Sequence, residues 1–175
     1  IGAADNIVSI DNVSILGNSI INSNLVAGGF IGRTKQNATI IDSSMTGGLV
    51  SSNGKAGGLI GENNQHTTIE NVRVTDTVVR GSGTSGGFVG FAGNGITITK
   101  AGFSNIKVTS TTDAAGGFVG YTGGAETTIK EVNCNGNVSV KGKNASGGII
   151  GQTNQAKVTV DTAKFLSKVE VTSDN

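Results

Sequence analysis

Apolar residues recur along this chain in pairs that are bracketed by glycine, in the pattern Gly-Gly-φ-φ-Gly, where φ is a large apolar residue. Five copies begin 29, 29, 30 and 31 residues apart, reading GGFIG at 28–32, GGLIG at 57–61, GGFVG at 86–90, GGFVG at 116–120 and GGIIG at 147–151. A near-constant period of this length is typical of repeat architectures, in which each unit packs on its neighbours.

A second apolar pattern follows each glycine element after 12 or 13 residues. It reads φ-x-x-φ-x-φ and then φ-x-φ, most clearly at Ile69, Val72, Val74 and Val78. The copy after Gly28 is degenerate, with Ile41, Ser44, Thr46 and Leu49. Because β-branched residues alternate with polar ones, each unit is expected to hold three short strands separated by polar corners.

Units of this size bury their apolar face only by stacking. The sequence therefore predicts an all-β fold, a parallel β-solenoid of about 5–6 turns of about 30 residues. We interpret residues 1–175 as one domain, with a partial repeat at 1–27 and repeats that start at 28, 57, 86, 116 and 147. Like residues should then stack in columns, one being Phe30, Leu59, Phe88, Phe118 and Ile149, and another Ile10, Ile41, Ile69, Ile98, Ile129 and Val160.

The motif glycines have a mechanical explanation, because glycine adopts positive φ or admits a second backbone at the lowest cost. We expect them at the corners that enter and leave the first strand: Gly28, Gly29, Gly32, Gly57, Gly58, Gly61, Gly86, Gly87, Gly90, Gly116, Gly117, Gly120, Gly147, Gly148 and Gly151. Strand neighbours point to opposite faces. If the Phe30 column points inward, Ile31, Ile60, Val89, Val119 and Ile150 form an outward apolar stripe, which either a fold-back of the turn or another subunit must cover.

Composition supports strands, since glycine supplies 29 of 175 residues, proline is absent and charged residues are only 14%. The net charge of +1 comes from scattered residues, so nucleic acid is not an expected partner, and no apolar run is long enough to span a membrane. The first residues, IGAADN, lack the charged leader and apolar core of a signal peptide. Cysteine-poor repeats rich in Ser, Thr and Asn are typical of bacterial surface proteins, which favours an extracellular or cell-surface location.

The five glycine elements, each followed by a Thr- and Asn-rich segment with a strand such as Asn71 to Val74, resemble the GLUG repeat. That motif is named for its Gly-Leu-hydrophobic-Gly core and is known from bacterial surface proteins, including streptococcal IgA-cleaving metallopeptidases. The resemblance implies a secreted or wall-anchored β-solenoid that serves as stalk, adhesin or scaffold. Phe often replaces Leu here, and the zinc-peptidase signature His-Glu-x-x-His is missing, because the sole histidine lies in His66-Thr67-Thr68-Ile69-Glu70. No protease activity carries over.

Residues for chemistry are sparse, so we expect no enzyme, no cofactor and no metal. Asp42, Glu70 and Asp161 recur at one register, but Thr99 and Lys130 interrupt the row and Asp11 extends it. A broken row of single acids is typical of a solvated face, with a weak cation site as the alternative. His66 has no second imidazole, and Cys134 falls in an apolar column with Val74 and Phe103.

The position after each glycine element is the strongest candidate site. It reads Arg33, Glu62, Phe91, Tyr121 and Gln152, so stacking would place Arg on Glu and Phe on Tyr. Such pairs stabilise neighbouring strands. The alternative is a contact site for a sugar or protein, with Phe91 and Tyr121 as an aromatic platform.

Neither end of the sequence carries a polar segment that could cap a solenoid turn. We therefore predict a non-enzymatic extracellular structural or adhesive module, either a filament subunit or a stalk segment, that assembles through its open ends. Its expected partners are copies of itself, head to tail, or adjoining repeats, with host or surface glycans and proteins as further candidates. The alternative is a carbohydrate-binding or carbohydrate-active β-helix with its site around Phe91 and Tyr121.

Overall fold

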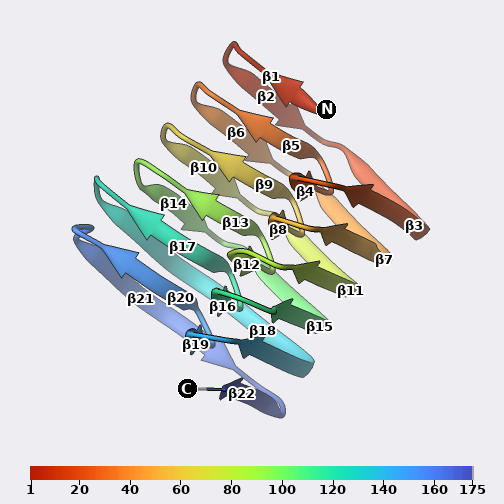
Figure 1. Ribbon diagram of the computed structural model, residues 1–175, viewed down its shortest axis with the longest axis vertical. Helices are drawn as coiled ribbons and strands as arrows, with labels where there is room; N and C mark the ends of the chain where they lie inside the picture. Colours follow the sequence, from red (N-terminus) through yellow and green to blue (C-terminus); the bar gives the residue numbers. More distant parts are fainter. Residues whose placement is uncertain (175) are drawn as a thin grey trace.

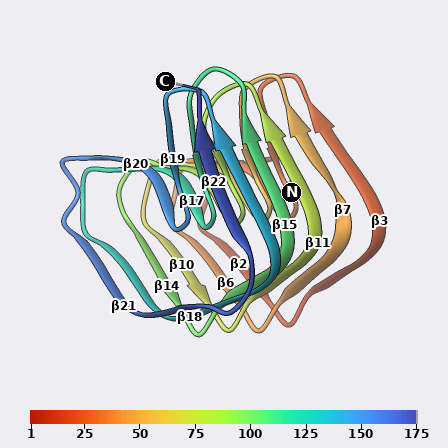
Figure 2. The ribbon, with the colours of Figure 1, turned by 90° about the horizontal axis from the view of Figure 1, so that it is seen from below.

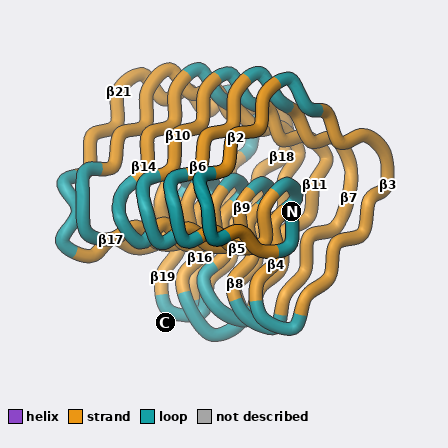
Figure 3. The backbone as a smooth tube through the Cα atoms, turned by 90° about the horizontal axis from the view of Figure 1, so that it is seen from above, coloured by secondary structure: helices purple, strands orange, loops and turns teal. Residues whose placement is uncertain are grey.

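The structure, a computed structural model, describes residues 1–174. These residues form strands and loops (Figure 3). The chain coils around one axis, and its turns stack from the N-terminal end to the C-terminal end (Figure 1). Equivalent strands of neighbouring turns pair in parallel. The predicted parallel β-solenoid with turns of about 30 residues is therefore confirmed.

Two sheets meet at the glycine motifs. Sheet A holds the strand that follows each glycine pair: β1 (Ala3–Ala4), β5 (Ile31–Thr34), β9 (Ile60–Asn63), β13 (Val89–Ala92), β17 (Val119–Gly123) and β20 (Ile150–Asn154). Sheet C holds the short strand that ends at the first glycine: β4 (Val26–Gly28), β8 (Lys55–Gly57), β12 (Ser85–Gly86), β16 (Ala114–Gly116) and β19 (Ala145–Gly147).

Sheet B is wider and has two halves. Its first half contains β2 (Val8–Asp11), β6 (Ala38–Ile41), β10 (Thr67–Glu70) and β14 (Ile96–Thr99). Its second half contains β3 (Ser14–Ser23), β7 (Ser44–Ser52), β11 (Arg73–Gly81), β15 (Gly102–Ser110) and β22 (Val169–Ser173). Two strands span both halves: β18 (Thr127–Gly142) and β21 (Val158–Phe165).

We number the turns 1 to 6, so that turn 1 is β1–β4, turn 2 is β5–β8, turn 3 is β9–β12, turn 4 is β13–β16, turn 5 is β17–β19 and turn 6 is β20–β22. Turns 2 to 4 each contain four strands instead of the expected three. The predicted second strand is divided by a corner, as at Asn71 between β10 and β11.

The core columns follow the strand register. The first predicted column is deeply buried at Phe30, Leu59, Phe88 and Phe118, and Ile149 is half-buried. The second is correct except in turn 2, where Ile40 pairs with Ile10 and Ile69, while Ile41 pairs with Asp11 and Glu70. The second apolar pattern of turn 2 is therefore shifted by one residue from the predicted alignment. In the correct register it keeps more of its apolar positions than the sequence alignment indicates.

The corrected register also explains two neighbours of Ile40. Met45, rather than Thr46, pairs with Val74 in the core and is fully buried. Ser43 is buried as well, and its hydroxyl donates to the Ile41 carbonyl at 2.6 Å and accepts from the Val13 N–H at 3.1 Å. A buried hydroxyl with both partners is tolerated in a column that is otherwise apolar.

A fold-back gives the coil its cross-section, which is visible in the view along the stack (Figure 2). The short strands of sheet C contact both sheet A and the second half of sheet B, as β8 does with β9 and β11. Ile31, Ile60, Val89 and Val119 are consequently fully buried, and Ile150 is half-buried. Of the two explanations for the apolar stripe, the fold-back is the correct one for these turns.

Glycine is needed at the glycine corner, where the chain turns from sheet C into sheet A, because of crowding. All the motif glycines lie within the described residues, and none has a positive φ. A Cβ on Gly58 or Gly87 would overlap the carbonyl oxygen of the second glycine of the next turn. The third glycine lies inside the sheet A strand, as Gly90 does in β13, and not at the exit corner that the sequence predicts.

Positive φ occurs instead at the left-handed corner, between the two halves of sheet B. Six exposed residues occupy it with φ between 47° and 56°: Asn12, Asp42, Asn71, Lys100, Glu131 and Thr162. A second column with positive φ bends the long strands at Gly17, Gly47, Asp76, Asn105 and Gly136. The strand register shifts at this bend, between Leu16 and Ser19 and between Ser104 and Ile106.

The first turn contains the end of a sixth glycine element. Ala3 pairs with Arg33, which places Gly2 at the position of Gly32 and Ile1 at the position of Ile31. The Ile1 amine donates to the Phe30 carbonyl at 2.8 Å, as the Ile31 N–H does to the Leu59 carbonyl at 3.0 Å. The sequence alignment counted five elements and missed this one.

Candidate functional site

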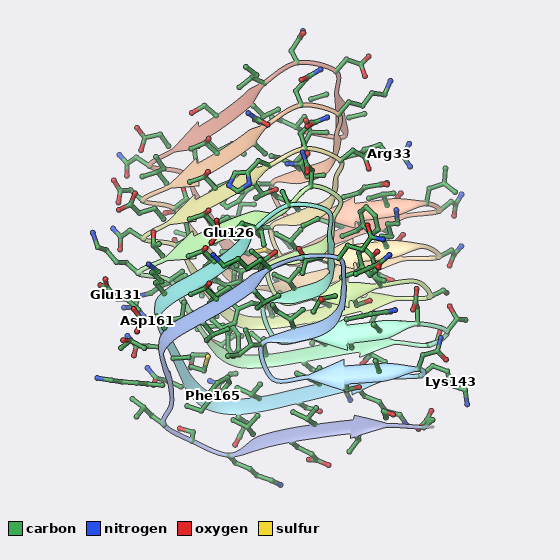
Figure 4. All side chains as sticks on the ribbon, turned by 90° about the vertical axis from the view of Figure 1, so that its left-hand side faces the viewer. Arg33, Glu126, Glu131, Lys143, Asp161 and Phe165 are labelled. Carbon is green, nitrogen blue, oxygen red and sulfur yellow. The ribbon has the colours of Figure 1, made fainter. Side chains whose placement is uncertain are left out.

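The five predicted site residues form one continuous row on sheet A. Register pairs join Arg33 to Glu62, Glu62 to Phe91, Phe91 to Tyr121 and Tyr121 to Gln152. Glu62 is buried, Gln152 is exposed, and the other three residues are half-buried. In the side-chain view, Arg33 lies on a different side of the coil from Glu131 and Asp161 (Figure 4).

The carboxylate of Glu62 is the charged centre of the row. Its Oε2 accepts from Arg33 Nε at 2.9 Å and its Oε1 from Lys55 Nζ at 2.6 Å. Burial alone would raise the pKa of Glu62, but the hydrogen bond and charge of Lys55, together with Arg33, outweigh burial and hold that pKa below its ordinary value. A carboxylate held ionised between two cations is unsuited to general acid catalysis at neutral pH.

Lys55 is a member of this site that the sequence did not reveal. It lies on β8, and its Nζ sits 3.8 Å from the centroid of the Phe91 ring, a cation–π distance. Lys55 precedes Glu62 by seven residues and reaches it only because sheet C folds back against sheet A. The sequence signal that could have indicated this contact is a lysine shortly before a glycine element and an acid directly after it.

The aromatic pair is stacked as predicted. The rings of Phe91 and Tyr121 are 4.9 Å apart at an interplanar angle of 2°. The rings extend along the strand, so that a Cβ on Gly93 would lie 3.2 Å from the Phe91 ring and one on Gly123 would lie 3.1 Å from the Tyr121 ring. Glycine two residues after each aromatic therefore leaves room for it.

The stacking limits what the pair can bind. Tyr121 covers one face of Phe91 from the following turn, and Lys55, from an earlier turn, lies over the ring. Phe91 therefore offers mainly an edge to a ligand, whereas a platform for a sugar uses a free ring face. This geometry favours the structural interpretation of the row, and the sugar site remains a prediction.

The acid row differs from the one that the sequence predicts. Asp42 lies at the left-handed corner, where its Oδ1 accepts from Asn71 Nδ2 at 2.6 Å. The row reads Asp11, Ile41, Glu70, Thr99, Lys130 and Asp161. Among residues 1–174 there is no group of three or more His, Cys, Asp or Glu side chains that could hold a metal ion.

A neighbouring row on the same face escaped the sequence alignment. Six turns contribute a Ser or Thr at one register: Ser9, Thr39, Thr68, Thr97, Thr128 and Thr159. His66 Nε2 lies 3.1 Å from Thr97 Oγ1 and so belongs to this face. The row could have been found by aligning turn 2 on Ile40 instead of Ile41.

Cys134 is buried in the predicted column between Phe103 and Phe165. Burial raises the pKa of its thiol to about 12. The thiol therefore stays protonated and unreactive at neutral pH, which fits a small core residue.

A family model for the GLUG motif matches residues 52–79. This stretch is similar to the GLUG motif. It runs from the end of β7 into β11 and contains the second glycine corner together with Lys55 and Glu62, so the resemblance to the GLUG repeat is confirmed there. No curated protein and no solved structure is significantly similar to the chain.

The GLUG motif and the β-solenoid fold are compatible with a surface repeat module. Within the described part of the chain, no helix is long and apolar enough to cross a membrane.

Proposed function

We propose that this chain is a non-enzymatic structural module of an extracellular surface, a stalk or filament element whose end turns stack on further solenoid turns of the same kind. The GLUG motif and the composition rich in Ser, Thr and Asn support the location. The absence of catalytic function is supported by the site itself, where the buried carboxylate of Glu62 is neutralised by Arg33 and Lys55.

The observation that carries the proposal is the exposure of core columns in the end turns. The column of Val50, Val79, Val108 and Val140 is fully buried, yet Val171 continues it into turn 6 with 40% of its surface exposed. Ile1 continues the Ile31 column into turn 1 and is 60% exposed. Another turn at either end would bury these side chains, at roughly 25 cal/mol per Å² of apolar surface.

Backbone geometry supports the same conclusion. Among the described residues, β2 and β3 in turn 1 pair on one side only, and so do β21 and β22 in turn 6. Parallel edges that face opposite directions along one axis make a heterologous, non-closing contact, which generates linear assemblies.

Electron microscopy and sedimentation velocity of the purified chain test the proposal. We expect long unbranched fibres or a ladder of oligomers, and strictly monomeric particles at high concentration would contradict assembly by this chain. Val171→Lys should suppress assembly because it places a charge in the stacking column. Thr172→Lys, whose side chain points outward, is the matched control and should assemble normally.

A further inference from the structure

A depression of about 480 Å³ lies on the outer face of sheet B, at the bend in the long strands. It crosses β11, β15 and β18, which pair side by side inside the stack (Figure 1). The outer two of these strands pair further with β7 and β22, so the depression is formed by interior turns and needs neither end of the coil. Its lining includes six side chains with distinct chemistry: Asp76, Val78, Asn105, Lys107, Asn137 and Ser139.

One side of the depression is a chain of hydrogen bonds along the bend. Asn105 donates from Nδ2 to Asp76 Oδ1 at 2.9 Å, and its Oδ1 accepts from the Asn137 N–H at 3.0 Å. These two bonds fix the orientation of the Asn105 amide. They leave Asp76 Oδ2 and the side-chain amide of Asn137 without a partner among the described residues.

The other side is an outward row of sheet B. Register pairs join Val78 to Lys107 and Lys107 to Ser139. Val78 and Ser139 are half-buried and Lys107 is exposed, while their strand neighbours, such as Val79 and Val108, are buried in the core. The Lys107 ammonium and the Ser139 hydroxyl have no hydrogen-bond or ion-pair partner within the described part of the chain.

The depression is specific to these turns and is not a general property of the repeat. In turns 1 and 2 the bend residues are Gly17 and Gly47, which carry no side chain, and the outward row is apolar. Turns 3 and 4 place a carboxylate and an amide at the bend, and the outward row becomes polar from β15 onwards. The extra residue that β18 holds at the register shift brings Asn137 beside Asn105. Such bulges are over-represented beside active sites, where they re-aim a side chain.

The chemistry of the lining favours a neutral ligand that is rich in hydroxyl groups. The Asp76 carboxylate only accepts hydrogen bonds, the Lys107 ammonium only donates them, and the amides do both. A sugar hydroxyl can bind to all three kinds of group, because it donates and accepts. The two charges cancel, which disfavours a simple anion or cation, and Val78 offers too little apolar surface for a hydrophobic ligand.

We propose that this depression binds one pyranose unit of a glycan. Asp76 Oδ2 accepts from hydroxyl groups of the sugar, Asn137 and Lys107 donate to them, and Val78 contacts the C–H groups of the ring. Binding is weak, because no aromatic side chain is among the described residues that line the depression and one side of the sugar stays in solvent. The site is separate from the row of Phe91 on sheet A, and it goes beyond the structural role proposed above without depending on it.

Titration of methyl glycosides into the isotope-labelled chain tests the proposal. The probes are the methyl pyranosides of glucose, galactose, mannose and N-acetylglucosamine, with glycine as a zwitterion and sulfate as an anion. At least one glycoside should shift the amide signals of Asp76, Asn105 and Asn137 saturably, whereas glycine and sulfate should not. The proposal is overturned if no glycoside does so, or if glycine or sulfate gives the same saturable shifts.

Asp76→Asn removes the carboxylate that we assign to the sugar, and Asp42→Asn is its matched control. Both aspartates are exposed with a left-handed φ, 49° and 47°, and each accepts from the side-chain amide of an asparagine in the next turn. Asparagine tolerates this φ and can still accept that hydrogen bond, so both variants should fold. Asp76→Asn should weaken glycoside binding at least about tenfold, and Asp42→Asn should leave it unchanged. Equal weakening by the two variants would contradict the site.

A glycan array separates this site from the aromatic row on sheet A. A signal that survives in the Phe91→Ala/Tyr121→Ala double variant and is lost in Asp76→Asn supports binding at the bend. The opposite pattern would place the sugar on sheet A and overturn the proposal.

Discussion

The glycine corner and the left-handed corner are both sharp, but they are built for opposite reasons. At the glycine corner φ is not positive and the space is missing, because Gly86 and Gly87 are buried against the backbone of the neighbouring turn. At the left-handed corner the φ angle is unusual, yet Asn71 and Lys100 project into solvent. Glycine is therefore required where a Cβ has no room, and other residues are accepted where only the dihedral is unfavourable.

The same contrast extends to the ion pairs beside the two corners. Glu62, beside a glycine corner, has a side chain only 10% exposed and binds two cations. Glu70, beside the left-handed corner, is 43% exposed and meets Lys100 at 3.4 Å. Crowding at one corner thus creates a desolvated charge site, while the other corner leaves its charges in water.

Gly90→Ala should give the largest effect. Its Cβ would lie 2.6 Å from the carbonyl oxygens of both Ala56 and Gly61, which are backbone atoms that cannot move aside independently. We expect a loss of at least about 3 kcal/mol in the free energy of unfolding, measured by urea denaturation.

Gly2→Ala is the control for this substitution, because Gly2 occupies the same motif position in turn 1 with nothing within 4 Å of its Cβ. It should change stability by less than about 0.5 kcal/mol. If the two variants lose the same amount, crowding is not what selects glycine at this position.

Glu62→Gln should have the next largest effect. The amide cannot satisfy Arg33 and Lys55 as the carboxylate does, and hydrogen bonds to charged groups are worth about 1.5–3 kcal/mol. We expect a loss of about 2 kcal/mol at pH 7 in the same denaturation assay. Glu70→Gln, beside the other corner, should cost less than about 0.5 kcal/mol, and a comparable loss would remove the distinction between the two ion pairs.

Low pH should remove the contribution of Glu62 to the free energy of unfolding. Because its pKa is lower in the folded state than in the unfolded state, the stabilisation is present above the unfolded value, near 4.5, and is lost as the pH falls through the folded value. The difference in unfolding free energy between wild type and Glu62→Gln should therefore shrink between pH 5 and strongly acidic pH. A difference that is constant with pH would show that the carboxylate charge is not involved.

Glu131→Asn tests the left-handed corner, where we expect the φ angle and not crowding to determine which residue is favoured. Glu131 is exposed at the left-handed corner with a φ of 53°, and asparagine adopts this region more readily than glutamate. We expect a gain of up to about 1 kcal/mol in unfolding free energy. Asn71→Glu, the reverse change at the same corner two turns earlier, should lose at least as much, because it also removes the hydrogen bond to Asp42. A loss for Glu131→Asn, or a gain for Asn71→Glu, would contradict the dihedral explanation.

Removing the aromatic pair should have the smallest effect, which we expect to be no change in carbohydrate binding. Since Phe91 is covered by Tyr121 and Lys55, a glycan array should report the same signal for wild type and for the Phe91→Ala/Tyr121→Ala double variant. A glycan that binds the wild type but not the double variant would instead establish the sugar site. Circular dichroism of the double variant checks that sheet A is intact.

Most of the fold was predictable because parallel stacking places like residues in register. The row from Arg33 to Gln152 follows directly from the spacing of the glycine motifs. The position of Ile40 was not predictable, because Ile40 and Ile41 are adjacent apolar residues and spacings of both 12 and 13 fit the pattern. Lys55 was missed because its contact with Glu62 depends on the fold-back, which only the packing of sheet C reveals.

The bend in the long strands has a consequence for how such a chain can evolve. Tandem duplication of a whole turn preserves every column, whereas one extra residue inside a regularly paired strand would move the core residues beyond it to the outer face. At the bend, Ser104 and Ile106 face Asn135 and Val138, so the later turn holds one extra residue without disturbing the pairs on either side. The bend is therefore a position inside the long strands where the number of residues in a turn can change without loss of the strand register.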